Sequence, residues 1–242
     1  MSILIVSGTG TEIGKTIVTA AVAALAAARG GGVAVVKPAQ TGMAPGEPGD
    51  LAEVSRLAGV RDTHEYARYP DPLSPAAAAR LSGLPPLSLG QAAADIRKLS
   101  EDRALVLVEG AGGLLVRYDE EGATLADLAR DLGAPVLVVA DPKLGTLNHT
   151  ALTLESMAAR GVELAGVVLG SWPYQGPETP DLAMRANLRD LETLAARPLA
   201  GALPAGAGRL DAPEFLLAAR AGLGPTLGGS FDAARFRGTW GV

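Results

Sequence analysis

The chain has 242 residues, of which 48% are hydrophobic and 19% are charged, a composition typical of a globular protein with a sizeable core. Its net charge of −5 argues against nucleic acid or an anionic membrane surface as a partner. Cysteine is absent, which excludes disulfides, thiolate nucleophiles and cysteine-ligated metals. We see no signal-peptide start and no apolar run of about 20 residues, so we expect a cytoplasmic protein with no membrane contact.

Short apolar runs alternate with longer helical patterns along the chain. Strands are expected at residues 3–6, 33–36, 105–108, 136–139, 164–169 and 199–203. Helices are expected at residues 15–29, 50–57, 76–81, 89–99, 125–132, 146–159, 182–195 and 213–220. The strands show no in–out alternation, which is typical of strands that are covered on both faces. We therefore predict an α/β fold, with a doubly wound, mostly parallel sheet of about six to seven strands and helices on both faces.

The order of these elements gives no sign of a repeat, a linker or a domain boundary. We expect one domain over residues 1–242, in which residues 222–242 form a weakly patterned and partly mobile tail.

The first motif, SGTGTEIGKTI at Ser7–Ile17, joins the first strand to the first helix. Glycines let consecutive backbone N–H groups turn towards an anion, and the new helix directs its free N–H groups at the same place. Lys15 adds a cation for phosphate, and Thr16 offers a hydroxyl group to Mg²⁺. Thr9 stands where the strict spacing has glycine, but the order of strand, loop and helix predicts a phosphate-binding loop of the P-loop NTPase type.

The second motif, VVKPAQTG at Val35–Gly42, begins in the second strand. Its Lys37 lies at the carboxyl end of that strand, which is the edge where parallel sheets bind ligands. Asp50 follows shortly after, and two interpretations of it stay open. It is either the N-cap of the next helix or a second carboxylate that faces magnesium.

The third motif, VEGAGG at Val108–Gly113, ends another buried strand. An acid at that position can reach the magnesium of a nucleotide held by the neighbouring loop. We therefore expect Glu109 to act as this acid, and the glycines after it to let the backbone approach phosphate.

Together these segments resemble the dethiobiotin synthetases. The matching segments are GTGTEIGKT at 8–16, KPAQTG at 37–42, VEGAGG at 108–113 and KLGTLNHT at 143–150. The resemblance covers most of residues 3–211, and it is the combination of motifs that makes it specific.

The resemblance implies an ATP-dependent ligase of biotin synthesis, with 7,8-diaminopelargonic acid, CO₂ and ATP as substrates and Mg²⁺ as the cofactor. One amine forms a carbamate, which attacks the γ-phosphate to give a carbamic–phosphoric anhydride. The second amine then closes the ureido ring and expels phosphate. Both steps concentrate negative charge on oxygen atoms, so positioned cations and N–H groups are expected to carry catalysis.

The resemblance also assigns residues to roles. The catalytic residues are Lys15, Lys37 and Thr41, and the magnesium ligands are Thr16, Asp50 and Glu109. The nucleotide-binding residues are Glu12, Ile13, Gly14, Lys15, Thr16, Ile17, Asp50, Glu109, Gly110, Ala111, Gly112, Gly170, Ser171, Leu203, Pro204 and Ala205. The substrate-binding residues are Glu12, Lys37, Thr41, Gly145, Thr146, Leu147 and Asn148. The last four start a helix that in this family comes from the partner subunit of a homodimer.

The chain departs from the family pattern where the base is recognised. Family members often carry an asparagine that reads adenine after the strand at 164–169, but this chain has Gly170 there. The later base-side element, often Pro-Trp, is Leu203-Pro204-Ala205. A glycine offers no side-chain amide, so we expect a loose choice of nucleobase with unchanged phosphate chemistry.

Other classes of P-loop protein fit the sequence less well. A ParA- or MinD-like ATPase switch has a signature lysine five residues before Lys15, where this chain has Gly10. A GTPase needs an Asn-Lys-x-Asp tetrapeptide and a glutaminase needs a cysteine, and the sequence contains neither. A nucleotide-binding module without enzymatic activity remains an alternative.

Overall fold

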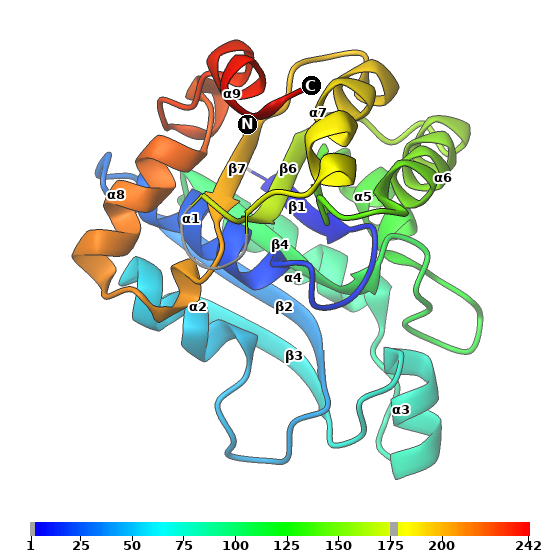
Figure 1. The fold of residues 1–242 in the computed structure, drawn as a ribbon. Helices are drawn as coiled ribbons and strands as arrows, with labels where there is room; N and C mark the ends of the chain where they lie inside the picture. The colour runs from blue at the N-terminus through cyan, green and yellow to red at the C-terminus, as the bar shows by residue number, and fades with distance from the viewer. Residues whose placement is uncertain (1–2, 175–178) are drawn as a thin grey trace.

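The computed structural model describes residues 3–174 and 179–242. Over these residues, seven parallel strands form one sheet in the order β3-β2-β4-β1-β5-β6-β7 (Figure 1). The strands are β1 (Ile3–Gly8), β2 (Val33–Thr41), β3 (Thr63–Tyr69), β4 (Leu105–Gly113), β5 (Val136–Ala140), β6 (Leu164–Trp172) and β7 (Gly201–Pro204). The predicted fold class, a doubly wound parallel α/β sheet, is confirmed.

Helices cover both faces of the sheet (Figure 1). The helices are α1 (Lys15–Ala27), α2 (Asp50–Ala58), α3 (Pro75–Ser82), α4 (Leu89–Asp102), α5 (Leu125–Leu132), α6 (Thr146–Ala159), α7 (Leu182–Ala195), α8 (Ala212–Gly222) and α9 (Ala233–Trp240). Buried side chains of α1, α2 and α8 form one core with the sheet, and those of the other helices form a second core on the opposite face. In the part of the chain that is described, no helix is long and apolar enough to cross a membrane.

Strand β3 lies at an edge of the sheet and is absent from the sequence prediction. Its sequence, THEYARY, is half-buried until Tyr69. An edge strand is covered less completely than a central one and tolerates charged side chains. The pattern that revealed the central strands, a continuous apolar run, is therefore missing here.

Strands β2 and β6 are longer than expected and carry site residues within them. We expected this strand only over residues 33–36, but it continues through Pro38 to Thr41. Proline is tolerated because β2 pairs with β4 only from Val33 to Val36, and pairs with β3 alone beyond that point. In the same way, Gly170 and Ser171 lie on β6 and not in a loop after it.

The segment predicted to be a weakly patterned tail contains helix α9. Phe236 and Trp240 lie four residues apart on this helix, and both pack edge-on against the buried ring of Trp172. Two arginines fasten the helix to its surroundings. Arg185 of α7 donates a hydrogen bond to the Trp240 carbonyl, and Arg237 of α9 pairs with Glu192 of α7.

The register of the central strands fixes the relative positions of the site residues. Glu109 on β4 pairs with Val6 on β1, two residues before Gly8, at which the phosphate-binding loop begins. Val36 on β2 pairs with Val108 on β4, so Lys37 and Glu109 follow at the same level. The carboxyl ends of β1, β2 and β4 therefore bring the three sequence motifs to one edge of the sheet.

Candidate active site

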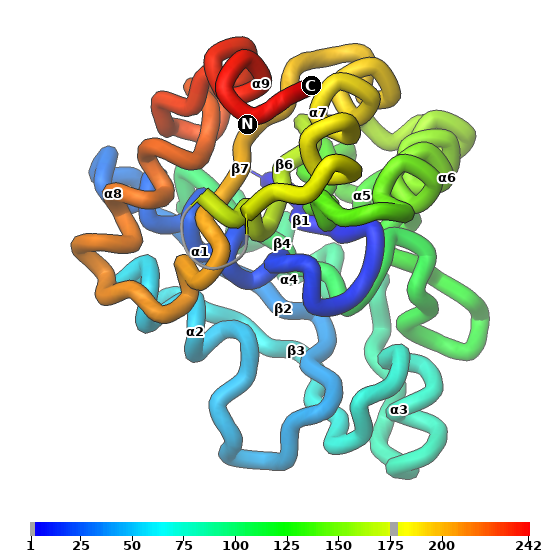
Figure 2. The backbone as a smooth tube through the Cα atoms, viewed as in Figure 1, coloured from blue at the N-terminus to red at the C-terminus, as the bar shows by residue number. Residues whose placement is uncertain are grey.

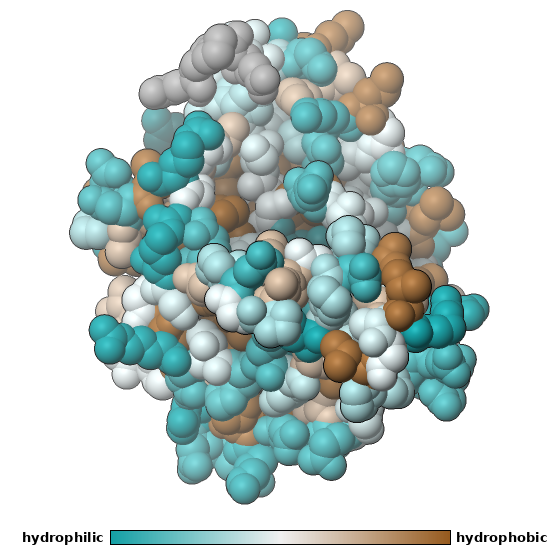
Figure 3. Space-filling view, turned by 90° about the horizontal axis from the view of Figure 1, so that it is seen from below, coloured by the Kyte–Doolittle hydropathy of each residue, from teal (hydrophilic) through white to brown (hydrophobic). Residues whose placement is uncertain are grey.

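A cavity of about 660 Å³ lies at the carboxyl ends of β1, β2 and β4. It is lined by Thr11, Glu12, Gly14, Lys15, Thr16, Ile17, Lys37, Ala39, Gln40, Thr41, Met43, Asp50, Pro72, Leu73, Ser74, Pro75, Glu109, Ala111, Gly112 and Val116. Figure 3, which views the molecule of Figure 1 from below, shows a mostly hydrophilic face with separate hydrophobic spots.

The loop between β1 and α1 has the backbone of an anion-binding loop. Gly14 adopts a left-handed conformation with φ of +93° directly before the first turn of α1. Glu12 has φ of +57°, which is uncommon for a residue other than glycine. Such strained backbone conformations persist only where the surrounding structure holds them in place, and they cluster at ligand-binding sites.

The side chain of Lys15 is buried and folds back over this loop. Its ammonium group donates a hydrogen bond of 2.7 Å to the carbonyl of Gly10. Burial, and next the nearby ammonium of Lys37, lower the pKa of Lys15 to about 8. The protein alone therefore compensates the positive charge of Lys15 poorly, and the negative charge of a phosphate group would compensate it.

Lys37 joins two carboxylates at the floor of the cavity. Its ammonium nitrogen lies 2.5 Å from Oδ2 of Asp50 and 2.8 Å from Oε1 of Glu109. The same Oε1 accepts a hydrogen bond of 2.9 Å from the hydroxyl of Thr16. Lys37 and Glu109 are 3% and 0% exposed, so water does not replace these contacts. The three motifs of the sequence thus meet in one network.

The pKa values of this network follow from burial and charge. Burial lowers the pKa of Lys37, but the charges of Glu109 and Asp50 outweigh burial and hold this pKa above its ordinary value. Burial raises the pKa of Asp50, but the Lys37 ammonium and hydrogen bonds from its neighbours keep it below its usual range. Lys37 and Asp50 are therefore both charged at neutral pH.

The donor set of the cavity fits a magnesium ion that also binds phosphate. Thr16, Asp50 and Glu109 supply one hydroxyl and two carboxylates, and Oε2 of Glu109 is buried without a hydrogen-bond partner among the described residues. Over residues 3–174 and 179–242, no group of three or more acidic, histidine or cysteine side chains could hold a metal by itself. Magnesium is commonly bound by one or two carboxylates, with substrate phosphates and water completing its coordination.

Asp50 is not the N-cap of α2. Gly49 occupies the N-cap position, and Asp50 is the first residue of the helix. The capping interpretation is therefore wrong, and the carboxylate of Asp50 points to Lys37 instead.

The glycine-rich end of β4 packs closely against its surroundings. A Cβ atom on Gly110 would lie 2.4 Å from the side chain of Leu125, so a side chain there would collide with α5. The Gly110 carbonyl accepts a hydrogen bond from Lys37, and the buried Tyr118 hydroxyl accepts one from the N–H of Ala111. This segment is thus held rigidly beside the cavity.

Most of the predicted site residues come together. Glu12, Gly14, Lys15, Thr16, Ile17, Lys37, Thr41, Asp50, Glu109, Ala111 and Gly112 line the cavity. Ile13 and Gly110 do not line it, but they flank residues that do. Their roles in binding and catalysis stay predictions.

Two predicted groups lie outside the cavity wall. The first is the base-side group. Gly170 packs against the phosphate-binding loop, where its Cβ would lie 1.9 Å from the Ile13 carbonyl, and Leu203 is fully buried in the core. The side chain of Leu203 is therefore not available to a nucleotide, and the nucleotide-binding role of Gly170, Ser171, Leu203, Pro204 and Ala205 stays a prediction. The second group, Gly145–Asn148, surrounds the start of α6 and does not line this cavity.

Several residues of the cavity wall were not among the predicted site residues. Thr11, Ala39 and Gln40 lie within the motifs, Met43 and Val116 follow shortly after motifs, and residues 72–75 follow β3. Recognition of β3 would have placed the loop after it at the same sheet edge. The sequence signal was therefore present for Pro72–Pro75, but it depended on an edge strand with little apolar pattern.

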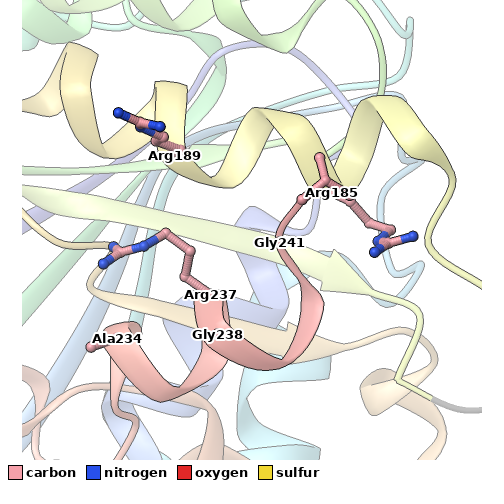
Figure 4. A pocket seen from close by; sticks show the side chains of 7 residues that line it. Arg185, Arg189, Ala234, Arg237, Gly238 and Gly241 are labelled. Carbon is pink, nitrogen blue, oxygen red and sulfur yellow. The ribbon is translucent and has the colours of Figure 1, made fainter.

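A second hollow of about 550 Å³ lies between α7 and α9. Three arginines line it, but Figure 4 shows the side chain of Arg185 pointing away from those of Arg189 and Arg237. Because these cations do not converge on one point, the hollow lacks the arrangement found at the sheet edge.

Comparisons with known proteins agree with this geometry. A family model described as an AAA domain matches residues 2–208. The ATP-dependent dethiobiotin synthetase BioD of Parafrankia sp. (strain EAN1pec) is 64% identical over 242 residues, which are 100% of both chains. The chain belongs to the dethiobiotin synthetase family. The protein of the same name from Frankia casuarinae is also 64% identical, over 98% of each chain.

Among solved structures, the cell-division ATPase MinD of Pyrococcus furiosus is similar to this member of the dethiobiotin synthetase family. The TM-score is 0.58 over 94% of this chain and 97% of the MinD chain, with 17% sequence identity. At this identity the likeness establishes the fold alone, and it agrees with the parallel sheet described above.

Proposed function

We propose that this protein is an ATP-dependent dethiobiotin synthetase that converts 7,8-diaminopelargonic acid, CO₂ and ATP into dethiobiotin, ADP and phosphate. The observation that carries the proposal is the convergence of Lys15, Lys37, Thr16, Asp50 and Glu109 on one cavity. Family membership supports the choice of substrate, because the relatives are named for that product.

The proposed reaction has three bond-forming steps. One amine of the diamine attacks CO₂ and loses a proton, which gives a carbamate. A carbamate oxygen attacks the γ-phosphorus of ATP, and ADP leaves. The second amine then attacks the carbonyl carbon of the mixed anhydride, the ring closes and phosphate leaves. Every step places negative charge on oxygens, so positioned cations lower the barriers.

The cavity residues suit these steps. The N–H groups of the loop before α1, together with Lys15, would hold the phosphates. Lys37 would stabilise the carbamate and the phosphoryl group in transfer. Thr41 would hydrogen-bond the amine or carbamate end of the substrate, with Glu12 near the diamine or the ribose. Both lie on the cavity wall, Glu12 within the motif of Lys15 and Thr41 within the motif of Lys37.

Thr16, Asp50 and Glu109 would hold Mg²⁺. When bound, this ion neutralises charge on the β- and γ-phosphate oxygens. In this structure the single Lys37 ammonium pairs with both carboxylates. Lys37 would release them when they take up the cation, and its own charge would then be available to the transferring phosphoryl group.

We further propose a homodimer in which the start of α6 completes the partner's site. Leu144 and Leu152 are 86% and 58% exposed around this helix, an apolar surface that a second copy would cover. The N-terminus of α6 would bind the far carboxylate of the substrate, because helix N-termini favour anions. Residues Gly145–Asn148 lie outside the cavity of their own protomer, as this arrangement requires.

The test of the proposed function is whether ATP turnover depends on the diamine. An ATPase switch of the MinD type would hydrolyse ATP without it. Product identification by mass spectrometry, with ¹³C-bicarbonate as the carbon source, would show whether a labelled ureido ring forms.

A further inference from the structure

Gln40 is a buried polar side chain beside the active site that the proposed mechanism does not use. It lies on β2 and is 4% exposed. Its Oε1 accepts a hydrogen bond of 2.9 Å from the N–H of Asp50, and its Nε2 donates one of 3.2 Å to the carbonyl of Thr41. One side chain therefore links a proposed metal ligand to a proposed substrate-binding residue.

The hydrogen bond to Asp50 replaces a missing helix cap. Helix α2 begins after Gly49, which has no side chain to accept a hydrogen bond from the first turn. Free N–H groups of a first turn need acceptors, and these normally come from the N-cap residue. Here Gln40 supplies one from the neighbouring strand, and so holds the residue whose carboxylate contacts Lys37.

Gly49 is what lets Gln40 come this close. A Cβ atom at position 49 would lie 2.7 Å from Oε1 of Gln40 and 3.0 Å from Nη2 of Arg68. Any other residue would push these two side chains away from the backbone before Asp50. Gln40, Gly49 and Arg68 thus fit together as one arrangement.

Arg68 fastens the other end of the same segment. Its Nε and Nη2 pair with the two carboxylate oxygens of Glu65 at 2.6 Å and 2.8 Å. Its Nη1 donates hydrogen bonds to the carbonyls of Glu47 and Ala44 at 2.8 Å and 3.2 Å. The loop of residues 42–49, visible below β2 in Figure 2, is thereby fixed to β3.

We propose that Gln40 and Arg68 are positioning residues that hold the backbone of Asp50 at the cavity, where its carboxylate can take up the cation, and thereby set the magnesium affinity of the active site. This inference rests on the proposed function for its metal. The side chain of Asp50 is 31% exposed and reaches Lys37 from the start of α2, directly after the loop of residues 42–49. We call the contacts of Gln40 and Arg68 with this segment the clamp. Without the clamp, ordering the loop of residues 42–49 costs conformational entropy each time the two carboxylates take up a cation.

The test uses Gln40→Leu, in which a side chain of similar size fills the same space but makes neither hydrogen bond. The readout is the stabilisation of the protein by Mg²⁺ and a non-hydrolysable ATP analogue, followed by thermal unfolding at increasing magnesium concentration without the diamine. We expect the half-saturating magnesium concentration to rise about threefold to tenfold, as the loss of one or two hydrogen bonds implies. Gln91→Leu is the matched control, because Gln91 contacts Asp95 on the exposed side of α4.

Arg68→Met tests the same clamp from its exposed end. We expect a similar rise in half-saturating magnesium, and an effect in the Gln40→Leu/Arg68→Met double variant that is not the sum of the two. Arg97→Met, which removes an exposed ion pair with Asp131, is its control. In turnover assays, the magnesium requirement should rise while the KM for the diamine changes by less than twofold.

A merely structural role predicts a different result. In that case both variants would lower the unfolding temperature of the free protein and leave the half-saturating magnesium within twofold of wild type. This outcome would overturn the inference. A wild-type protein that binds magnesium with the nucleotide analogue but does not consume ATP with the diamine would instead contradict the proposed function and leave the clamp intact.

Discussion

The hydroxyl of Thr16 donates a hydrogen bond of 2.9 Å to Oε1 of Glu109, across 93 residues of sequence. This contact joins the first turn of α1 to the end of β4. It places the loop that would hold phosphates beside the acid that would face magnesium. Substitutions in either motif are therefore expected to affect the same bound nucleotide.

Lys15→Ala is expected to abolish ATP turnover while the protein still folds. The ammonium of Lys15 contacts only the Gly10 carbonyl among the described residues, and its burial already disfavours the charged form. One charge-assisted hydrogen bond to a phosphate contributes about 1.5–3 kcal/mol, so affinity for the nucleotide should fall about 10- to 150-fold. Circular dichroism shows whether the variant folds, and isothermal titration calorimetry measures its affinity for the nucleotide. Near-normal ATP turnover would refute the assignment of this loop as the phosphate-binding loop.

Lys37→Gln is expected to reduce the chemical step more than nucleotide binding. Its cation is proposed to act on charge that develops during phosphoryl transfer, and removal of one such donor costs about 10²–10³ in kcat. Single-turnover kinetics with saturating ATP would measure the step directly, and calorimetry would measure the affinity. Equal losses in binding and in kcat would contradict the role of Lys37 in the transition state.

Asn148→Ala is expected to raise the KM for 7,8-diaminopelargonic acid about threefold to tenfold, with little change in the KM for ATP. Asn148 is exposed at the start of α6 and lies outside the cavity of its own protomer. Loss of one hydrogen bond to the substrate carboxylate gives this magnitude. Light scattering tests the premise, since a monomeric active enzyme would exclude a site shared between subunits.

The nucleobase is expected to matter little. Gly170 carries no amide to read adenine, and two lost neutral hydrogen bonds remove roughly 1–3 kcal/mol of discrimination. CTP, GTP and UTP should therefore support appreciable turnover at equal magnesium. A preference for ATP above about a hundredfold in kcat/KM would show that another group reads the base.

The close packing of Gly170 adds a second arm to that experiment. A Cβ at position 170 would collide with the Ile13 carbonyl of the phosphate-binding loop. Gly170→Asn is therefore expected to weaken the binding of all four nucleoside triphosphates to a similar extent. An increased preference for ATP in this variant would instead mean that the loop can move to admit the side chain.

The sequence predicted the part of the site that is built from motifs on buried strands. Lys37 and Glu109 each directly follow a continuous apolar run, Lys15 follows one through the phosphate-binding loop, and the carboxyl ends of parallel strands meet at one edge. Their meeting in one network is therefore a consequence of the strand pattern and the parallel topology. The roles of these residues in catalysis stay predictions.

Features that depend on contacts between distant segments could not be predicted in this way. Gln40 caps a helix from another strand, and only the folded chain brings it to Asp50. The close approach of Gly170 to the loop at Ile13 likewise depends on tertiary packing. Strand β3 was missed because an edge strand needs no continuous apolar run. Helix α9 was missed because its one pair of aromatic residues at helical spacing, Phe236 and Trp240, stands among arginine, glycine and threonine.

The central claim is that ATP is consumed to close a ureido ring on a diamine. The most direct measurement is ATP turnover by the purified protein with magnesium, with and without 7,8-diaminopelargonic acid and bicarbonate. We expect phosphate release only when both are present, with one dethiobiotin formed for each ATP consumed. Phosphate release at the same rate without the diamine, or without formation of dethiobiotin, would contradict it.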